Sequence, residues 1–295
     1  MFNKSEVLLE ICHDENINIS EAVLRKQVED TGKDRDYFIE RFRESYQVMK
    51  ESSTRGIENE VITMSGITGG NGKRVNDYRS SGKAVSDDFV LEAMARALST
   101  LEVNGAMGKI VAAPTAGASG ILPAALVTFQ NKKGLTDDEM INGLLTASAI
   151  GGMIAMNATI SGAEGGCQAE TGAASAMAAA ALVELNGGSV DEAINAASFA
   201  IINILGLVCD PIAGLVEFPC ALRNASGVTN AIISCDLAMA GVKSIIPFDE
   251  VVEAMYSVGN SLPASLRETA LGGLAITPTG SKFTVSSCSG ACTGI

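Results

Sequence analysis

The sequence contains no tryptophan, and aromatic residues make up only 4% of its 295 positions. It also contains no run of alternating β-branched residues long enough to nucleate a sheet. Alanine and glycine are abundant by contrast, with 31 glycines in the chain. A core with few bulky side chains must be built from small residues that approach closely, which favours packed helices over a β-sandwich. The sequence therefore predicts an all-α fold, in a single compact helical domain with glycine-rich loops.

Basic residues are also scarce, because 21 Lys and Arg face 34 Asp and Glu. The resulting net charge of -13 would repel nucleic acids and anionic membrane surfaces, which excludes a nucleic-acid partner. The first ten residues lack the basic flank and apolar stretch of a signal peptide. We therefore expect a cytoplasmic protein.

Residues 140–163 carry no charged side chain, and a stretch of this length could cross a membrane. It contains polar residues such as Asn142, Asn157 and Ser161, however, and it lacks flanking aromatic anchors. A helix buried on all sides explains the same pattern. We therefore predict a core helix and no membrane partner.

Three regions follow one another along the chain. Residues 1–58 place apolar side chains at helical spacing, which predicts amphipathic helices that pack on the core. Residues 59–280 form the predicted helical catalytic domain, and residues 281–295 form a flexible, cysteine-containing tail rich in Ser and Gly. Capping boxes predict helix starts at Thr136 and Ser189. Further helices are predicted at 86–103, 170–185, 228–242, 248–258 and 264–274.

Seven cysteines, an odd number, indicate thiols or metal ligands in a reducing compartment rather than a disulfide framework. Cys12 and Cys235 fit buried small hydrophobes. Cys167, Cys209 and Cys220 lie instead in segments rich in glycine or proline and lined with polar groups. Their spacing contains no C-x-x-C and is by itself a weak metal signal, which their local context strengthens.

Three segments in this order carry a family resemblance: APTAGASG at 113–120, SGAEGGCQAE at 161–170 and LVCDPIAGLVEFPC at 207–220. They resemble the α subunit of iron–sulfur-dependent L-serine dehydratase, and the similarity extends over about residues 64–280. The resemblance implies an all-helical catalytic unit that holds a [4Fe-4S] cluster through Cys167, Cys209 and Cys220, with one iron left open. It implies L-serine as the substrate and no pyridoxal phosphate.

Two glycine-rich loops, 64–72 and 113–120, offer amides and hydroxyls that could form a nest for a carboxylate, with Lys73 nearby in sequence. Alone, each loop is more often a tight turn, but the resemblance favours an anion site. The predicted substrate-binding residues are Thr68, Gly69, Gly70, Lys73, Thr115, Ala116, Gly117, Ser119 and Gly120.

Elimination of water also needs a base for the Cα proton. The sole histidine, His13, lies in a charged N-terminal segment far in sequence from every glycine-rich motif and fits a solvated residue. Lys73 and Glu164 are the catalytic candidates, and Lys109 and Glu170 also stay open. Alternatively the base belongs to a β subunit, because the family that this chain resembles includes α and β pairs as well as fused chains.

The last residues carry two more cysteines, Cys288 and Cys292. In some relatives a C-terminal cysteine binds the open iron, and either residue could do so here, although a disordered tail fits equally well. Three other functions stay open at this point. They are a cysteine desulfidase-type lyase, an iron–sulfur protein for electron transfer or sensing with four permanent ligands, and a purely structural helical subunit.

Overall fold

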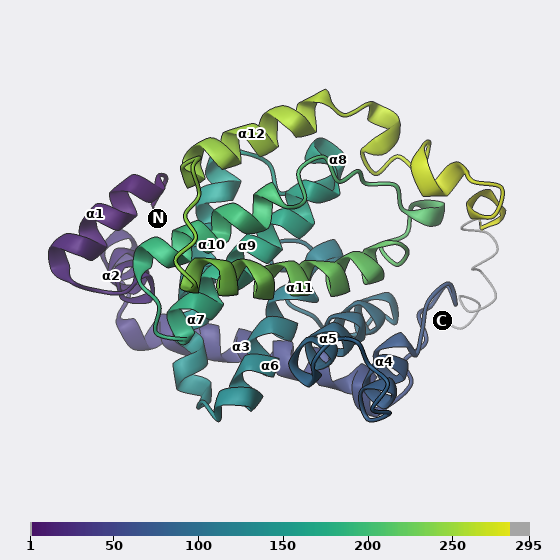
Figure 1. Cartoon of the computed structure of the whole chain (residues 1–295), viewed down its shortest axis with the longest axis horizontal. Helices are drawn as coiled ribbons and strands as arrows, with labels where there is room; N and C mark the ends of the chain where they lie inside the picture. Colours follow the sequence, from purple (N-terminus) through teal and green to yellow (C-terminus); the bar gives the residue numbers. More distant parts are fainter. Residues whose placement is uncertain (1, 284–295) are drawn as a thin grey trace.

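The computed structural model describes residues 2–283, and in this part of the chain it contains twelve α-helices and no β-strand (Figure 1). This confirms the predicted all-α fold. The first six helices are α1 (Ser5–Glu15), α2 (Ile19–Thr31), α3 (Arg35–Glu58), α4 (Asn71–Arg79), α5 (Asp88–Gly105) and α6 (Ile121–Lys133). The other six are α7 (Asp137–Asn157), α8 (Gly162–Gly165), α9 (Cys167–Leu185), α10 (Val190–Ile202), α11 (Cys220–Met239) and α12 (Phe248–Ser261).

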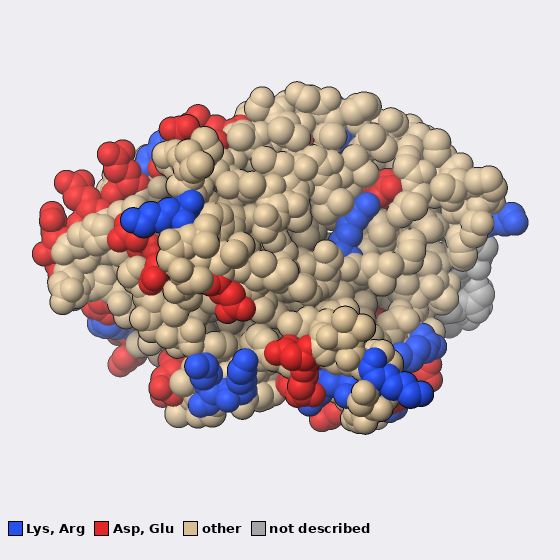
Figure 2. Space-filling view, in the orientation of Figure 1, with Lys and Arg blue, Asp and Glu red and all other residues tan. Residues whose placement is uncertain are grey.

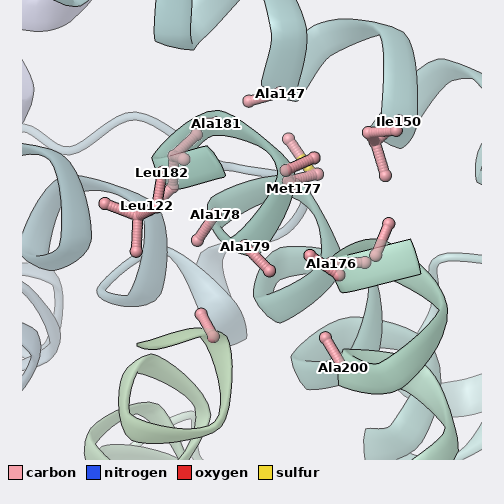
Figure 3. Packing of buried hydrophobic residues seen from close by; sticks show 14 of the residues in the cluster. Leu122, Ala147, Ile150, Ala176, Met177, Ala178, Ala179, Ala181, Leu182 and Ala200 are labelled. Atoms are coloured by element: carbon pink, nitrogen blue, oxygen red, sulfur yellow. The ribbon is translucent and has the colours of Figure 1, made fainter. Parts of the chain in front are cut away.

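Helix α9 is the centre of the core. Every one of its residues from 167 to 183 is buried, and it contacts α6, α7, α10 and α11. Its alanines, shown in Figure 3, keep the neighbouring backbones close. Small residues on α7 are required as well, because a Cβ at Gly143 would lie 2.6 Å from Leu185 Cδ1. The predicted core of closely packed small residues is confirmed.

Helix α7 contains most of the long uncharged stretch. It begins with the predicted capping box, in which the Glu139 amide donates to Thr136 Oγ1 at 3.3 Å and the Thr136 amide donates to Glu139 Oε2 at 2.7 Å. By length and hydropathy it is the one helix among residues 2–283 that could cross a membrane, but 67% of its most apolar window is buried inside the protein. The prediction of a core helix is confirmed.

Other predicted helices are confirmed or corrected. Three helices form within residues 5–58, as predicted, and α10 begins with the expected Ser189 capping box. Helix α11 starts at Cys220, eight residues before its predicted start at 228. The predicted helix at 264–274 is wrong, since this stretch forms the short 3-10 turns η3 (Ala264–Leu266) and η4 (Gly273–Ile276). Positive φ angles at Glu268 (62°) and Ala270 (56°) interrupt any helix there.

Carboxylates from distant helices cap three helices that have no side-chain cap of their own. Asp249 on α12 accepts from the first amide of α1, Glu184 on α9 accepts from an amide of α2, and Glu102 on α5 accepts from the first amide of α4. A carboxylate at a helix N-terminus satisfies unpaired amides and complements the helix dipole. These bonds therefore fasten α1, α2 and α4 to the core.

Apolar side chains from the N-terminal helices, such as Leu8 and Ile19, belong to the same hydrophobic core as α9. The division of the chain at residues 58 and 280 stays a prediction. Charged side chains are concentrated over the N-terminal helices and over the region of α4–α6, whereas the face formed by α11 and α12 is largely uncharged (Figure 2).

Candidate active site

Three buried cysteines lie where the central helices begin. Cys167 is the first residue of α9 and Cys220 is the first residue of α11. Cys209 lies in the segment between α10 and α11, where its amide donates to Leu266 O at 2.8 Å. The exposed fractions of Cys167, Cys209 and Cys220 are 3%, 2% and 5%. Helix N-termini favour thiolates, so two of the three thiols are placed where a negative charge is stabilised.

The three thiols influence one another electrostatically. Burial, followed by the charges of Cys167 and Glu170, raises the pKa of Cys220 to about 12. The pKa of Cys209 is raised by burial first, and then by Cys167, Glu170 and other nearby negative groups including Cys220. Burial also raises the pKa of Cys235 to about 12, but no other thiol contributes there. Metal ligation requires the thiolate forms, whose mutual repulsion a bound cation would offset, so the trio is compatible with a metal centre.

Among residues 2–283, no three His, Cys, Asp or Glu side chains are close enough to hold one metal ion. The three thiols therefore do not form a closed site for a single ion. A cluster of several irons differs in this respect, because each thiolate binds a different iron.

Arg223, one turn after Cys220, is a functional candidate that sequence reasoning missed. Its guanidinium donates to Val208 O at 2.9 Å and to Asp210 Oδ1 at 2.7 Å. Its positive charge lowers the pKa of Cys167 against the larger effect of burial. The sequence could have indicated this residue, because side chains three positions apart on a helix lie on the same face, which places Arg223 next to the candidate ligand Cys220.

Two of the glycine-rich segments meet around the carboxyl group of Glu170. A Cβ at Gly162 would lie 2.7 Å from Glu170 Oε2 and 3.0 Å from Cys209 Sγ, so carboxyl and thiol flank the same glycine. A Cβ at Gly117 would lie 3.1 Å from Glu170 Oε1, which also accepts a hydrogen bond from Thr115 Oγ1 at 2.7 Å. Burial raises the pKa of Glu170, the Thr115 bond opposes this, and a nearby Glu268 adds to the rise.

The loop at 113–120 is held in place by Asn224 of α11. Asn224 Nδ2 donates to Gly117 O at 2.6 Å, and its Oδ1 accepts from the Gly120 amide at 2.9 Å. Ser119 is fully buried and donates its hydroxyl to Ala116 O at 2.8 Å. Residues 116–118 form the short 3-10 turn η1 (Ala116–Ala118), and within residues 2–283 the amides of Ala116 and Gly117 donate to no protein acceptor. This predicted loop therefore presents two amides to an anion, while its Ser119 hydroxyl is used internally.

The loop at 64–72 is bonded differently. The amides of Asn71 and Gly72 already donate to the Glu102 carboxylate, at 2.6 and 3.4 Å. The hydroxyl of Thr68 donates to Glu217, and Lys73 Nζ pairs with Asp77 at 2.9 Å. Part of the predicted nest is thus occupied by the protein's own carboxylate. The substrate-binding role of Thr68, Gly69, Gly70 and Lys73 stays a prediction.

The other base candidates lie away from the thiols or at the surface. His13 and Lys109 are exposed, and His13 Nε2 lies 2.7 Å from Asp191 Oδ2. Glu164 is also exposed, accepts from Thr159 Oγ1 at 2.6 Å and lines an open pocket of about 350 Å³. Glu170 is the one base candidate whose charge acts on the thiols. Cys288 and Cys292 lie outside the described residues.

The helices and the three buried thiols define an all-α protein with a cysteine-lined candidate metal centre. The family model described as serine dehydratase alpha chain matches residues 14–275. The L-serine dehydratase alpha chain of Peptoniphilus asaccharolyticus is 51% identical, and the match covers 96% of this chain and 97% of that relative. A probable L-serine dehydratase alpha chain of Bacillus subtilis is 45% identical, with 96% and 94% covered.

An L-serine dehydratase of Streptomyces coelicolor is 36% identical over 93% of this chain, but the match spans only 61% of that longer relative. Together these similarities cover the fold and all three cysteine segments. The chain belongs to the serine dehydratase alpha chain family.

Proposed function

We propose that this chain is the catalytic α subunit of an iron–sulfur-dependent L-serine dehydratase, a lyase that converts L-serine into pyruvate and ammonia. The single observation that carries the proposal is the gathering of three buried thiols beside the Glu170 carboxyl, next to a loop with two unpaired amides. The names of the relatives support the same reaction.

Cys167, Cys209 and Cys220 would hold a [4Fe-4S] cluster with one iron free of protein ligands. Their burial and electrostatic coupling support this assignment, because a multiply charged cation would stabilise three neighbouring thiolates. When bound, the cluster supplies Lewis-acid chemistry that makes the substrate hydroxyl a better leaving group. Pyridoxal phosphate has no part in this proposal.

The chain's own residues would bind the substrate and move protons. The amides of Ala116 and Gly117 would bind the carboxylate of serine, and Asn224 keeps their loop in position. Glu170 would hold a proton on Oε2, the oxygen that receives no bond from Thr115, and deliver it to the departing hydroxyl. Elimination leaves an enamine, which tautomerises and hydrolyses to pyruvate and ammonia.

The Cα proton needs a separate base, for which Lys73 and Glu164 remain the candidates on this chain. A β subunit is the alternative source. The Streptomyces relative supports such a partner, since its length beyond the match would correspond to a second chain here. The same proposal includes serine binding by Thr68, Gly69, Gly70, Thr115 and Gly120. It also includes closure of the open iron by Cys288 or Cys292, and a cytoplasmic location without nucleic-acid partners.

Anaerobic reconstitution with iron and sulfide, with and without the β chain, tests this function. We expect a visible cluster absorbance and pyruvate from L-serine, with full activity only when both chains are present. Preferred release of sulfide from L-cysteine would instead indicate a desulfidase. A stable cluster without turnover of either amino acid would indicate electron transfer or sensing.

A further inference from the structure

Four carboxyl side chains are buried in the described part of the chain: Glu102, Glu170, Asp210 and Glu217. Asp210 pairs with Arg223 at 2.7 Å. None of the other three has a Lys, Arg or His nitrogen within 4.0 Å among residues 2–283. A buried carboxylate without a cation is costly unless hydrogen bonds satisfy both of its oxygens. These three groups therefore need an explanation.

Glu102 is explained by the fold, because each of its oxygens accepts a backbone amide from the start of α4. Glu217 is different. Three hydroxyls donate to one of its oxygens, Oε2: those of Thr63 at 2.7 Å, Ser65 at 2.6 Å and Thr68 at 3.2 Å. Its other oxygen, Oε1, accepts no bond from any described residue, yet it is not among the polar atoms sealed from solvent. The side chain of Glu217 is 6% exposed, and its unpaired oxygen is accessible to a small ligand.

The atoms around this carboxylate are oxygens rather than positive groups. Thr63 Oγ1 also lies 2.8 Å from the carbonyl oxygen of Thr68, so Glu217 Oε2 and this carbonyl share the single Thr63 hydroxyl proton, and another acceptor stands beside Glu217. A negative charge surrounded by hydroxyls repels anions and attracts a small cation that can donate hydrogen bonds. A primary ammonium group, with three donors and one positive charge, matches this environment.

Glu217 also lies close in the chain to one of the candidate ligands. It precedes Cys220 by three residues, and its carbonyl accepts the Ala221 amide at 2.9 Å in the turn that starts α11. One turn further along the same helix, Asn224 holds the loop that presents the unpaired amides of Ala116 and Gly117. A negative group and an anion-binding loop are therefore both attached to the start of the helix that bears Cys220. An amino acid carries the two complementary charges.

From this arrangement we infer that Glu217 Oε1 binds the α-ammonium group of the substrate and makes the site select amino acids over hydroxy acids. The hydroxyls of Ser65 and Thr68 hold the carboxylate in position through Oε2. This inference rests on the proposed function, in which the substrate is L-serine and its carboxylate binds at the amides of Ala116 and Gly117.

Glu217→Gln tests it, because the glutamine oxygen can take the place of Oε2 and accept the hydroxyl bonds, while the charge is lost and an NH2 donor replaces Oε1. We expect KM for L-serine to rise roughly tenfold to a hundredfold, as for loss of a charged hydrogen bond. Cluster absorbance should stay at the wild-type level, and kcat should change less than KM. The matched control is Glu184→Gln, which removes a carboxylate near the C-terminal end of α9, whereas Cys167 begins this helix. It should leave KM unchanged. An unchanged KM in Glu217→Gln would overturn the inference.

A binding measurement separates this inference from the proposed function. Calorimetric titration of the reconstituted protein with L-serine and with L-glycerate, which has a hydroxyl in place of the amino group, gives an affinity ratio. We expect the wild type to bind L-serine at least tenfold more tightly, and Glu217→Gln to bring the ratio close to one. Equal affinities in the wild type would overturn the inference even if the variant fails to fold. Absence of pyruvate formation with a normal affinity ratio would overturn the dehydratase function and leave the ammonium site standing.

Discussion

Helix α9 carries a glutamate near each end, and the two differ in one respect that separates a structural group from a functional one. Burial raises the pKa of both Glu170 and Glu184. The two lie roughly 20 Å apart along the helix, at 1.5 Å per residue. Glu184 uses both oxygens, for the Ser20 amide and for the Thr146 hydroxyl. Among residues 2–283, Glu170 has one hydrogen bond, from Thr115, and its Oε2, which flanks Gly162 together with the Cys209 thiol, accepts none. Hydrogen-bond saturation, rather than burial, distinguishes the two ends.

The largest effect should come from the thiols at the N-terminal end. Cys167→Ala, Cys209→Ala and Cys220→Ala should each lose the cluster absorbance after anaerobic reconstitution, because a three-ligand site cannot readily lose a thiolate. Cys235→Ala, which removes a buried thiol distant from this trio, should retain it. Normal iron content in any of the first three variants would remove that residue from the ligand set.

The two glutamates themselves give the next largest difference. Glu170→Gln should lower kcat roughly a hundredfold, because glutamine cannot supply the proton that we assign to Oε2. In the wild type, kcat should fall as pH rises through the raised pKa of Glu170, and this limb should vanish in the variant. Glu184→Gln serves as the control and should keep the wild-type pH profile. Equal kcat values for the two variants would erase the distinction between the helix ends.

A smaller effect is expected from the residue that holds the anion-binding loop. Asn224→Ala leaves Gly117 O and the Gly120 amide without their partners, which should destabilise the fold by about 1–3 kcal/mol. It should also raise KM for L-serine, because the loop loses its fixed position. Thr229→Val removes a helix hydroxyl further along α11 and should leave KM unchanged. A stability loss in Asn224→Ala without any change in KM would separate the loop from substrate binding.

The smallest effect concerns the C-terminal end of α9. The pKa of Glu184 is raised above its ordinary value of 4.5 in the folded protein, so the folded state binds more protons in this range. Its contribution to stability should be fully present below pH 4.5 and should be lost as pH rises through the raised pKa. Glu184→Gln removes this pH-dependent loss of stability, while Glu102 and Glu170 contribute the same pH dependence to the wild type and the variant. A plot of Tm against pH should therefore be flatter for the variant, and parallel curves would refute the assignment.

Much of the fold could be predicted because its signals are local. The capping boxes at Thr136 and Ser189 determined two helix starts, and the scarcity of bulky residues indicated the small-residue core around α9. Helix α4 was missed because its cap, Glu102, lies about thirty residues away in sequence and its first residues favour turns. The error at 264–274 has the opposite cause, since tertiary contacts impose positive φ angles on residues with ordinary helix propensity.

The candidate site also has residues that local sequence patterns could identify and residues that they could not. Motif resemblance identified Cys167, Cys209 and Cys220, and the structure places their segments at the starts of α9 and α11. Arg223 and Glu217 were not identified, because their significance depends on which groups surround them and not on a local pattern. Glu170 was one of several possible bases until its neighbours were known.

The central claim is that the N-terminal end of α9 holds the iron of a serine-dehydrating enzyme. Anomalous diffraction at the iron absorption edge, from anaerobic crystals of the reconstituted protein, tests it most directly. The account predicts one strong iron peak enclosed by Cys167, Cys209 and Cys220, with Glu170 beside it. Iron bound elsewhere on the chain, or no ordered iron in a protein that still forms pyruvate, would contradict it.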